Sequence, residues 1–459
     1  MIGIKGVGMT MLAEFLVRQG YAVSGSDTAE TFMTDRVLEK AGIPVFQGFS
    51  AAHVPAAADL IIYSTAYSPE NNEEVKAAVE GRRHAATYAE ALAGVFNSRS
   101  GIAVCGSHGK TTTSAWIGYV MERAGLSPSV MVGARVPQFD GAGRSGTSNY
   151  LVIEADEYQN KLAHFNPKMI VLNNIEWDHP DFFPTAADYE RAFADFVAKL
   201  PKSGKLIANF DDEAVRRVAA QCPGAIISYA LDSEADYVAT DIRYLNGRQF
   251  FRVLLRPSGE PIEGETDELG TFAISLPGRH NIANALAVIA CCLELGVELR
   301  DLRSHLEAFS GTARRFERLG EYNGALIIDD YAHHPTEIKA TIAAVRQMYG
   351  ERRLRVIFHP HTYTRTKSLL KEFGSSFSGA DEVSVLGIYG SAREEHGGVS
   401  AEDVAAEIRA HGIANAAVRQ TLEETEAYLR QTAKPDEIIL LLGAGDVFRI
   451  GQRLIEPAV

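Results

Sequence analysis

The residues best suited to chemistry lie in the stretch 106–113, which reads Gly-Ser-His-Gly-Lys-Thr-Thr-Thr and follows an apolar run. Glycines at both ends of a short turn let backbone N–H groups curl around phosphate oxygens, and a helix predicted over 114–124 adds its N-terminal dipole. Lys110 would supply a point charge, and the Thr111 hydroxyl could ligate Mg²⁺. The general motif has another glycine where this chain has Val104, so we predict a shorter phosphate loop. The alternative is a packing turn with an incidental lysine.

Two acidic clusters follow apolar runs in the same part of the chain. The stretch 154–157 reads Glu-Ala-Asp-Glu, and 173–179 reads Asn-Asn-Ile-Glu-Trp-Asp-His. Because the carboxyl ends of parallel strands meet at one sheet edge, both clusters should lie near the phosphate loop. Carboxylates there would repel phosphates unless a metal intervenes, so we expect Glu154 and His179 to ligate Mg²⁺. Histidine is an unusual Mg²⁺ ligand, so a structural His179 is the alternative.

Further polar groups occur later in the chain. Asn281 and Asn284 are three apart in a predicted helix, so both lie on one face. That pair suits an adenine edge or a bridge to a neighbouring loop, with helix capping by Asn281 as the alternative. The clusters 329–335 (Asp-Asp-Tyr-Ala-His-His-Pro) and 359–366 (His-Pro-His-Thr-Tyr-Thr-Arg-Thr) each follow an apolar strand. Their position predicts metal or phosphate chemistry at a sheet edge, and a solvated surface is the alternative.

The N-terminus holds a second glycine-rich turn. The stretch 3–8 reads Gly-Ile-Lys-Gly-Val-Gly, follows a very short strand and precedes a helix predicted over 9–19. A strand predicted at 21–23 leads to Ser-Asp at 26–27, which is the layout of a dinucleotide-binding unit. The glycine spacing differs from G-x-G-x-x-G, so we expect a diphosphate other than NAD. A turn needed only for strand–helix packing is the alternative.

Short apolar runs alternate with amphipathic stretches of helix length. This pattern predicts an α/β fold with buried parallel strands. The predicted strands are 2–4, 60–63, 102–104, 151–153, 169–172, 326–328, 354–358 and 438–442. Interruptions in this alternation of apolar runs and helix-length stretches predict three domains, at 1–98, 99–312 and 313–459. Residues 234–275, with strands at 237–240 and 250–255, predict a small antiparallel insertion in the second.

Composition narrows the class of protein. The chain has 459 residues and a net charge of −14, so it has no bulk attraction for nucleic acid or an anionic membrane. Its four cysteines form no disulfide framework or zinc spacing, which indicates a reducing compartment. The N-terminus has no signal-peptide pattern, and the most apolar stretch, 282–295, is too short to span a membrane. We therefore expect a soluble, multidomain, cytoplasmic protein.

The motifs together resemble the Mur ligase family in order and spacing, from Gly3 to about Gly445. They include Gly-Ser-His-Gly-Lys-Thr-Thr-Thr, Glu-Ala-Asp-Glu, Asn-Ile-Glu-x-Asp-His, Gly-Arg-His-Asn-x-x-Asn, Arg-Arg-Phe, Asp-Asp-Tyr-x-His-His-Pro-Thr-Glu and Pro-His-x-Tyr-x-Arg-Thr. The resemblance implies a Rossmann-like first domain that binds a UDP-sugar and a central P-loop ATPase-type domain. It also implies a Rossmann-like third domain that binds an amino acid. The implied reaction is ATP-dependent amide formation through an acyl phosphate, with Mg²⁺, in peptidoglycan precursor synthesis.

The resemblance also implies site residues, carried over motif by motif. Lys110 would stabilise the transferring phosphoryl group, Thr111 and Glu154 would hold one Mg²⁺, and His179 would hold a second. The implied ATP site comprises Gly106, Ser107, His108, Gly109, Lys110, Thr111, Thr112, Asn281, Asn284, Arg315 and Asp330. The implied UDP-sugar site comprises Gly6, Val7, Gly8, Met9, Asp27, Ser64 and Thr65. The implied amino-acid site comprises Tyr331, His333, His361 and Arg365, with Arg365 pairing the carboxylate and His333 or His361 accepting the amine proton.

The expected substrates are UDP-N-acetylmuramate and L-alanine. Four positions depart from the common family pattern, namely Phe49, the pair 158–159 (Tyr-Gln) and Thr362. The pair 173–174 (Asn-Asn) resembles muropeptide ligases, so a ligase that joins a tripeptide to the same sugar nucleotide is the alternative. A non-catalytic nucleotide-binding module and a nicotinamide oxidoreductase are further alternatives, but neither needs a second phosphate loop with Lys-Thr. We expect a monomer or weak homodimer that binds no nucleic acid and no membrane.

Overall fold

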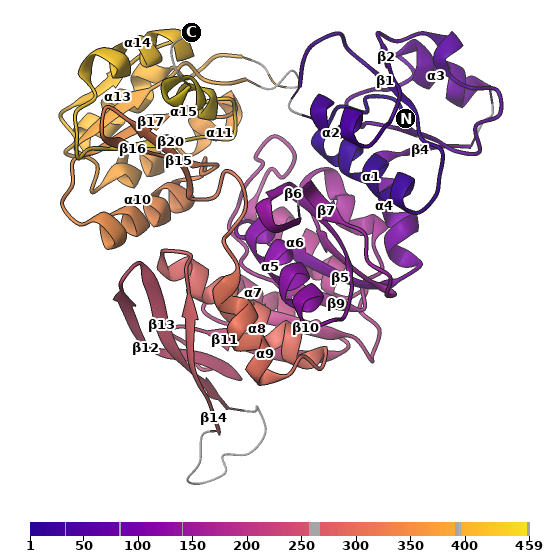
Figure 1. Cartoon of the computed structure of the whole chain (residues 1–459), viewed down its shortest axis with the longest axis horizontal. Helices are drawn as coiled ribbons and strands as arrows, with labels where there is room; N and C mark the ends of the chain where they lie inside the picture. Colours follow the sequence, from indigo (N-terminus) through magenta and orange to yellow (C-terminus); the bar gives the residue numbers. More distant parts are fainter. Residues whose placement is uncertain are drawn as a thin grey trace.

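The computed structural model describes residues 1–32, 34–81, 84–139, 141–256, 267–390, 394 and 396–456. They form three α/β domains, and Figure 1 shows the N-terminal one at the upper right, the central one below and the C-terminal one at the upper left. The predicted α/β class with three domains is confirmed.

The N-terminal domain is built on short parallel strands. β1 pairs with β2, β3 pairs with β4, and Ile2 bridges the two pairs through Ser26 and Tyr63. Its elements are α1 (Val7–Arg18), β1 (Gly25–Asp27), α2 (Asp35–Lys40), β2 (Val45–Gln47), η1 (Ala51–His53), β3 (Ile61–Tyr63), α3 (Glu73–Glu80), β4 (Ala85–Thr87) and α4 (Tyr88–Asn97).

Two strand predictions in this domain are wrong. The run 2–4 forms only a one-residue bridge, because Gly3 takes a left-handed φ of +76° and starts the glycine turn at once. The strand predicted at 21–23 lies instead at Gly25–Asp27. Gly25 permits that position, since a Cβ there would lie 2.6 Å from the carbonyl oxygen of Met1.

The central domain contains a ten-stranded sheet in the order β14-β13-β12-β11-β10-β9-β5-β8-β6-β7. Its strands are β5 (Ser100–Cys105), β6 (Ser129–Val136), β7 (Gly141–Arg144), β8 (Tyr150–Glu154), β9 (Met169–Leu172), β10 (Lys205–Asn209), β11 (Ala225–Ala230), β12 (Tyr237–Leu245), β13 (Arg248–Leu255) and β14 (Asp267–Ile274). In this order, the strands between β12 and β6 are mutually parallel. β7 is antiparallel to β6, and β12, β13 and β14 are antiparallel to one another in turn. The prediction of antiparallel strands at 234–275 is therefore confirmed for the described residues of that range. These strands do not form a sheet of their own but extend the main sheet.

Helices cover both faces of this sheet. They are α5 (Lys110–Arg123), α6 (Ala186–Val197), α7 (Glu213–Ala219), α8 (Arg279–Glu294) and α9 (Leu299–Ala308), with 3₁₀ turns η2 (Pro137–Phe139) and η3 (Tyr158–His164). One core packs α5, α8 and α9 on one face, and a second core joins α6 and α7 to α1 and α4 of the N-terminal domain. Apolar packing therefore docks the N-terminal domain on the central sheet.

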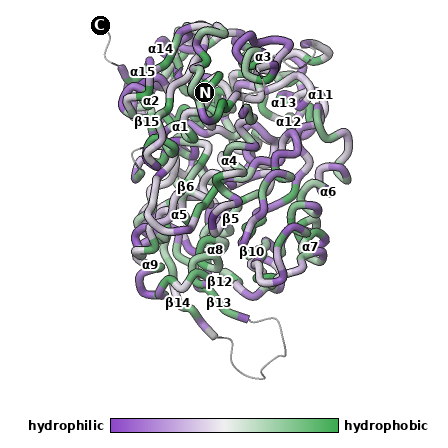
Figure 2. Tube along the Cα trace, turned by 90° about the vertical axis from the view of Figure 1, so that its right-hand side faces the viewer, coloured by the Kyte–Doolittle hydropathy of each residue, from purple (hydrophilic) through white to green (hydrophobic). Residues whose placement is uncertain are grey.

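The apolar stretch 282–295 is explained by this packing. It forms most of α8, which is buried on nearly all sides and appears largely green in Figure 2. Among the described residues, no helix is long and apolar enough to cross a membrane.

The C-terminal domain contains a six-stranded sheet in the order β15-β16-β20-β17-β18-β19, parallel except for β15. Its elements are β15 (Glu317–Tyr322), β16 (Ala325–Asp330), α10 (Pro335–Tyr349), β17 (Leu354–Phe358), α11 (Tyr363–Ser368), α12 (Leu370–Gly374), η4 (Ser375–Phe377), β18 (Glu382–Val385), α13 (Ala401–Ala410), β19 (Ala416–Val418), α14 (Leu422–Thr432), β20 (Ile438–Leu442) and α15 (Phe448–Ile455). Asp330, Leu442 and Phe358 lie level in register, so the clusters that follow β16 and β17 meet at one edge.

Candidate active site

The phosphate loop connects β5 to α5 in the central domain. Gly106 and Gly109 have left-handed φ angles of +128° and +77°. A Cβ on Gly109 would lie 2.7 Å from Asn284 Oδ1 and 2.9 Å from Asn173 Nδ2, so only glycine fits between these amides. The helix predicted over 114–124 in fact begins at Lys110, because the glycine turn ends there. The loop therefore directs backbone N–H groups and a helix N-terminus to one point.

Lys110 lies across the mouth of this loop. Its Nζ donates to the carbonyl of Gly106 at 2.6 Å and to Glu157 Oε2 at 3.0 Å. Glu157 is 1% exposed and also accepts a hydrogen bond from the Tyr189 hydroxyl at 2.8 Å. Burial opposes the ammonium charge, but Glu157 and then Asp156 overcome it and raise the pKa of Lys110. A fixed, fully protonated cation is thus held at the phosphate loop.

Oxygen ligands suited to Mg²⁺ lie beside that cation. The Thr111 hydroxyl donates to Glu154 Oε1 at 2.9 Å, and the Gly133 N–H donates to Glu154 Oε2 at 2.7 Å. His179 is separate from this pair and lies with Asp156 and Glu157, with ligand atoms within 4.8 Å of one another. The hydroxyl and carboxylates fit a Mg²⁺ ion, which prefers oxygen ligands.

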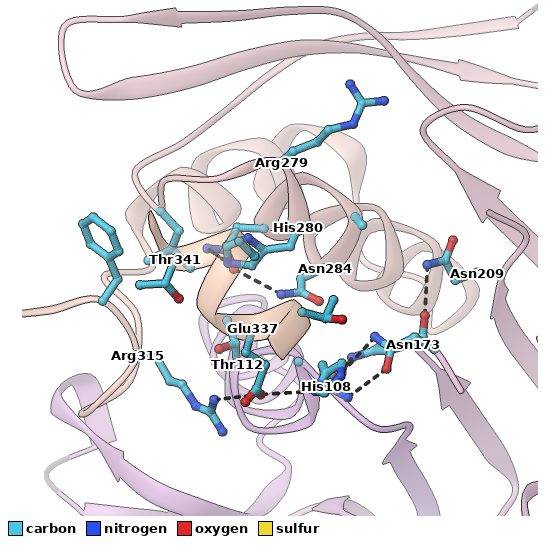
Figure 3. A pocket seen from close by; sticks show the side chains of 18 of the residues that line it. His108, Thr112, Asn173, Asn209, Arg279, His280, Asn284, Arg315, Glu337 and Thr341 are labelled. Carbon is cyan, nitrogen blue, oxygen red and sulfur yellow. Dashed lines mark hydrogen bonds and ion pairs between the residues drawn. The ribbon is translucent and has the colours of Figure 1, made fainter. Parts of the chain in front are cut away.

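A cavity of about 350 Å³ opens next to the phosphate loop, between the central and C-terminal domains (Figure 3). Asn281 and Asn284 line it from α8, and the Asn284 amide donates to Asn281 Oδ1 at 3.1 Å. Asn281 donates back to the carbonyl of Pro277 and does not cap the helix, so the capping alternative is not seen. His108, Gly109, Thr112, Arg315 and Asp330 line the same cavity, whose size suits a small organic ligand.

Arg315 and Asp330 enter the cavity from the C-terminal domain. The Asp330 carboxylate accepts the N–H groups of Phe316 and Ala332, both at 2.8 Å, and so fixes the segment that carries Arg315. Burial raises the pKa of Asp330 to about 6, although Arg315 lowers it. The Arg315 guanidinium lies over the Tyr331 ring, with its carbon 5.0 Å from the ring centre.

The predicted amino-acid residues meet at the carboxyl edge of the C-terminal sheet. The ring centre of His333 lies 5.3 Å from that of Tyr331 and 6.1 Å from that of His361. Arg365 approaches His361 Nδ1 at 3.3 Å through one terminal nitrogen. Burial, followed by the charge of Arg365, lowers the pKa of His333 to about 3 and that of His361 to about 4. The expectation that either ring accepts an amine proton near neutral pH is therefore not supported in this conformation.

Arg365 also ties the two domains together. Its Nε and second terminal nitrogen donate to the two oxygens of Asp178, at 2.8 and 3.2 Å. The side chains of Arg365 and Asp178 are only 3% and 7% exposed. Asp178 belongs to the central cluster 173–179, so this ion pair brings that cluster against the C-terminal domain. The fork expected for a substrate carboxylate is engaged by a protein carboxylate here.

The predicted UDP-sugar residues lie apart from the cavity, on the N-terminal domain. The residues 6–9 form the N-cap and first turn of α1, where Val7 is exposed and Met9 is buried. Asp27 accepts the N–H groups of Lys5 and Thr28, at 2.7 and 2.8 Å, so its carboxylate holds the glycine turn. The segment 64–65 lies beside that turn, since the Ser64 N–H donates to Ile2.

Four residues at the site carry no role in the sequence-based prediction, although each lies in a recognised motif. Glu157 ends the Glu-Ala-Asp-Glu run, and Glu176 and Asp178 lie in the second acidic cluster. Glu337 ends the run that begins at Asp329 and contacts Arg315 at 3.5 Å. Their motifs give the signal, but their roles depend on partners in other elements, such as Lys110 for Glu157 and Arg365 for Asp178.

Three family models match the chain in order. The Mur ligase family catalytic domain matches residues 1–100, the Mur ligase middle domain matches 104–292, and the Mur ligase glutamate ligase domain matches 314–445.

Full-length relatives and solved structures agree with these models. The UDP-N-acetylmuramate–L-alanine ligase of Desulfitobacterium hafniense (strain Y51) is 41% identical, over 99% of this chain and 98% of that protein. The same-named protein of Desulfosudis oleivorans (strain DSM 6200 / JCM 39069 / Hxd3) is 37% identical, over 99% and 97%. The crystal structure of UDP-N-acetylmuramate-alanine ligase from Thermotoga maritima matches with a TM-score of 0.82, 25% identity and coverage of 99% and 97%. A murein peptide ligase from Psychrobacter arcticus 273-4 matches with a TM-score of 0.72, 26% identity and coverage of 100% and 99%.

Proposed function

The chain belongs to the Mur ligase family, and we infer that it is an ATP-dependent ligase that joins L-alanine to the carboxylate of UDP-N-acetylmuramate. The reaction belongs to peptidoglycan precursor synthesis. The observation that carries this function is the cavity that the phosphate loop shares with Arg315 and Asp330 of the C-terminal domain. The buried contact between Arg365 and Asp178 holds the cluster of predicted amino-acid residues against the central domain beside it. ADP release that requires both UDP-N-acetylmuramate and L-alanine would test it.

The chemistry explains why two domains must meet. A carboxylate is a poor electrophile until one oxygen becomes a phosphate leaving group, so the substrate carboxylate is converted to an acyl phosphate that the amine attacks. Cations must then line the phosphate path. We assign Lys110 and Arg315 to that path, one from each domain. The buried contact between Asp178 and Arg365 would close the cleft and exclude water from the acyl phosphate.

We place the domain boundaries at 1–98, 99–312 and 313–459. The sheets support this division, because β5 begins at Ser100 and β15 begins at Glu317. The UDP-sugar would bind the N-terminal domain, through the backbone of residues 6–9 and the segment 64–65. We expect the reaction to take place in the cytoplasm, on a monomer or weak homodimer.

ATP would occupy the cavity between α8 and α10, with its adenine near Asn281 and Asn284. Thr111 and Glu154 would hold one Mg²⁺, and His179 with Asp156 and Glu157 would hold a second. Mg²⁺ bound there would offset the charge of the phosphates. The chain's own part is to hold these ligand atoms close together.

Activity should therefore depend on a divalent cation. Excess EDTA should stop ADP release, and added Mg²⁺ or Mn²⁺ should restore it. Glu154→Ala or His179→Ala should each lower kcat by about 10²-fold, the scale of losing one preorganised electrostatic group. Undiminished turnover in EDTA would refute the metal requirement. Near-normal rates in both variants would refute the choice of ligands.

The pH dependence of the reaction should follow the amine and not a histidine base. Burial and Arg365 keep His333 and His361 neutral, with pKa values of about 3 and 4. Neither ring therefore changes charge near the ordinary histidine pKa of about 6.5. We expect kcat/KM for L-alanine to rise with the fraction of neutral amine. An inflection near pH 6.5 that disappears in His333→Asn would contradict this expectation.

The muropeptide ligase remains the second candidate. The pair 173–174 favours it, and the murein peptide ligase structure shares the fold. In this chain the two asparagines bracket the phosphate loop. The Asn173 amide donates to the carbonyl of His108 at 3.2 Å, and Asn174 Oδ1 accepts the His108 N–H at 2.8 Å. They thus have a role in loop geometry, which does not bear on the choice of amine.

A further inference from the structure

His108, on the phosphate loop, lies between two carboxylates. Its Nε2 is 2.9 Å from Glu176 Oε2, and its Nδ1 is 3.2 Å from Glu337 Oε1. An ionised carboxylate only accepts hydrogen bonds, so a ring between two of them carries a proton on each nitrogen. Burial opposes this charge, but Glu337 and Glu176 raise the pKa of His108 to about 9. The loop therefore holds an imidazolium in addition to the Lys110 ammonium.

The two carboxylates come from different domains. Glu176 precedes Asp178 in the central domain, and its other oxygen accepts the Thr336 hydroxyl at 2.6 Å. Glu337 lies in the first turn of α10 in the C-terminal domain. His108 is thus a point at which the C-terminal domain contacts the phosphate loop directly, and Figure 3 shows Glu337 directed at both His108 and Arg315.

The two carboxylate oxygens of Glu337 have different partners. Oε2 accepts the N–H groups of His333 and His334, at 3.1 and 3.4 Å, and completes the capping box of α10. Oε1 faces the cavity, where His108 lies at 3.2 Å and Arg315 at 3.5 Å. Burial opposes ionisation, but the charges of His108 and Arg315 hold the pKa of Glu337 well below its usual range. One buried anion is therefore the common partner of a cation from each domain.

We propose that Glu337 is a positioning residue for phosphoryl transfer, which holds the His108 imidazolium and the Arg315 guanidinium in place across the closed cleft. This proposal rests on the proposed function. A carboxylate in a cavity that receives a polyphosphate repels that ligand, so helix capping alone would favour an uncharged group there. The negative charge is explained if its two cations must be aligned before the phosphoryl group moves.

Loss of the Glu337 charge should give a specific kinetic pattern. Removing the Glu337 charge makes the cavity more positive by one unit, so nucleotide binding in the ground state should not weaken. His108 and Arg315 lose their shared ion-pair partner, so they should stabilise the transition state less well. We therefore expect kcat to fall while KM for ATP stays level or falls. A residue that only supports the fold would instead raise KM and lower thermal stability.

Glu337→Gln separates the two tasks, because glutamine also completes a capping box but cannot pair with two cations. We expect kcat for ADP release to fall about 10-fold or more, with KM for ATP and the calorimetric Kd for ADP unchanged or lower. The melting temperature should stay within a few degrees of the parent chain. The matched control is Glu351→Gln, an exposed glutamate just after α10, which should match the parent in all four measurements.

A double variant tests the route through His108. If Glu337 acts through that ring, His108→Asn should remove much of the effect of Glu337→Gln, so the two losses in kcat should not multiply. Parental kcat in Glu337→Gln, a raised KM for ATP or Kd for ADP, or fully multiplicative losses would overturn the proposal. Failure of both Glu337→Gln and Glu337→Asp to fold would assign the residue to structure and overturn it as well.

Failure of the proposed function would look different. The parent chain would then release no ADP with UDP-N-acetylmuramate and L-alanine. The Kd for ADP and the melting temperature of Glu337→Gln need no ligase activity, and they would still test whether the carboxylate opposes nucleotide binding.

Discussion

Lys110→Ala should lower kcat for ADP release by about 10²–10³-fold, the scale of removing one preorganised group that stabilises transition-state charge. The ammonium lies at the phosphate loop, 2.6 Å from the carbonyl of Gly106, where charge moves during phosphoryl transfer. Calorimetry should show unchanged affinity for UDP-N-acetylmuramate, because we place that ligand on the N-terminal domain. Lys168→Ala, at an exposed lysine of the same domain, is the matched control and should behave as the parent chain.

The same substitution leaves Glu157 buried without its cation, so lost stability must be separated from lost chemistry. The double variant Lys110→Ala with Glu157→Gln removes the unpaired charge. It should regain thermal stability but turn over far more slowly than Glu157→Gln alone, if Lys110 acts on the phosphoryl group. Recovery of turnover to the level of Glu157→Gln alone would show that the lysine only neutralises Glu157. Loss of UDP-N-acetylmuramate binding in either variant would contradict the division of sites between domains.

Arg365→Ala should have the second large effect, and it should appear in two measurements. Breaking a buried ion pair and leaving Asp178 unpaired costs about 3–5 kcal/mol, so thermal stability should fall and small-angle scattering should show a larger radius of gyration. KM for L-alanine should rise about 10-fold or more, with smaller changes for ATP and the UDP-sugar, if the terminal nitrogen that now contacts His361 pairs the amino-acid carboxylate.

Two further variants show whether the effect of Arg365→Ala is specific to its guanidinium. Arg365→Lys should rescue poorly, because an ammonium cannot make the forked contact with Asp178. Arg409→Ala breaks a partly exposed ion pair with Glu402 in the same domain and a hydrogen bond to the carbonyl of Ala416, and it should change KM and stability much less. Equal increases in the KM values of all three substrates would assign Arg365 to domain closure alone. Parental KM and stability in Arg365→Ala would contradict both roles.

Much of the site could be predicted because its signals are local in the chain. The order of strand, glycine turn, Lys110 and Thr111 specifies a phosphate loop within about ten residues, and the structure has that order. The clusters that follow β16 and β17 were predicted at one sheet edge, because parallel strands align their carboxyl ends, and the register confirms it.

The rest depends on contacts that no local pattern contains. Arg365 and Asp178 are 187 residues apart, and their pairing depends on how two domains dock. The pairing of His108 with Glu337 has the same origin. The wrong prediction of a strand at 21–23 shows that contacts outside the local pattern also decide the position of a single strand. Apolar character alone favoured that run, whereas pairing with Ile2 and the close approach at Gly25 select 25–27.

The most direct test of the account is the mass of the product formed from UDP-N-acetylmuramate, ATP and Mg²⁺ when different amines are offered. L-Alanine should give the fastest ADP release and a product heavier by one alanyl residue. Glycine and L-serine should react more slowly but measurably, since a small pocket discriminates by only about 1–3 kcal/mol per group. A product that forms only with the tripeptide L-Ala-D-Glu-diaminopimelate, and none with L-alanine, would contradict the account.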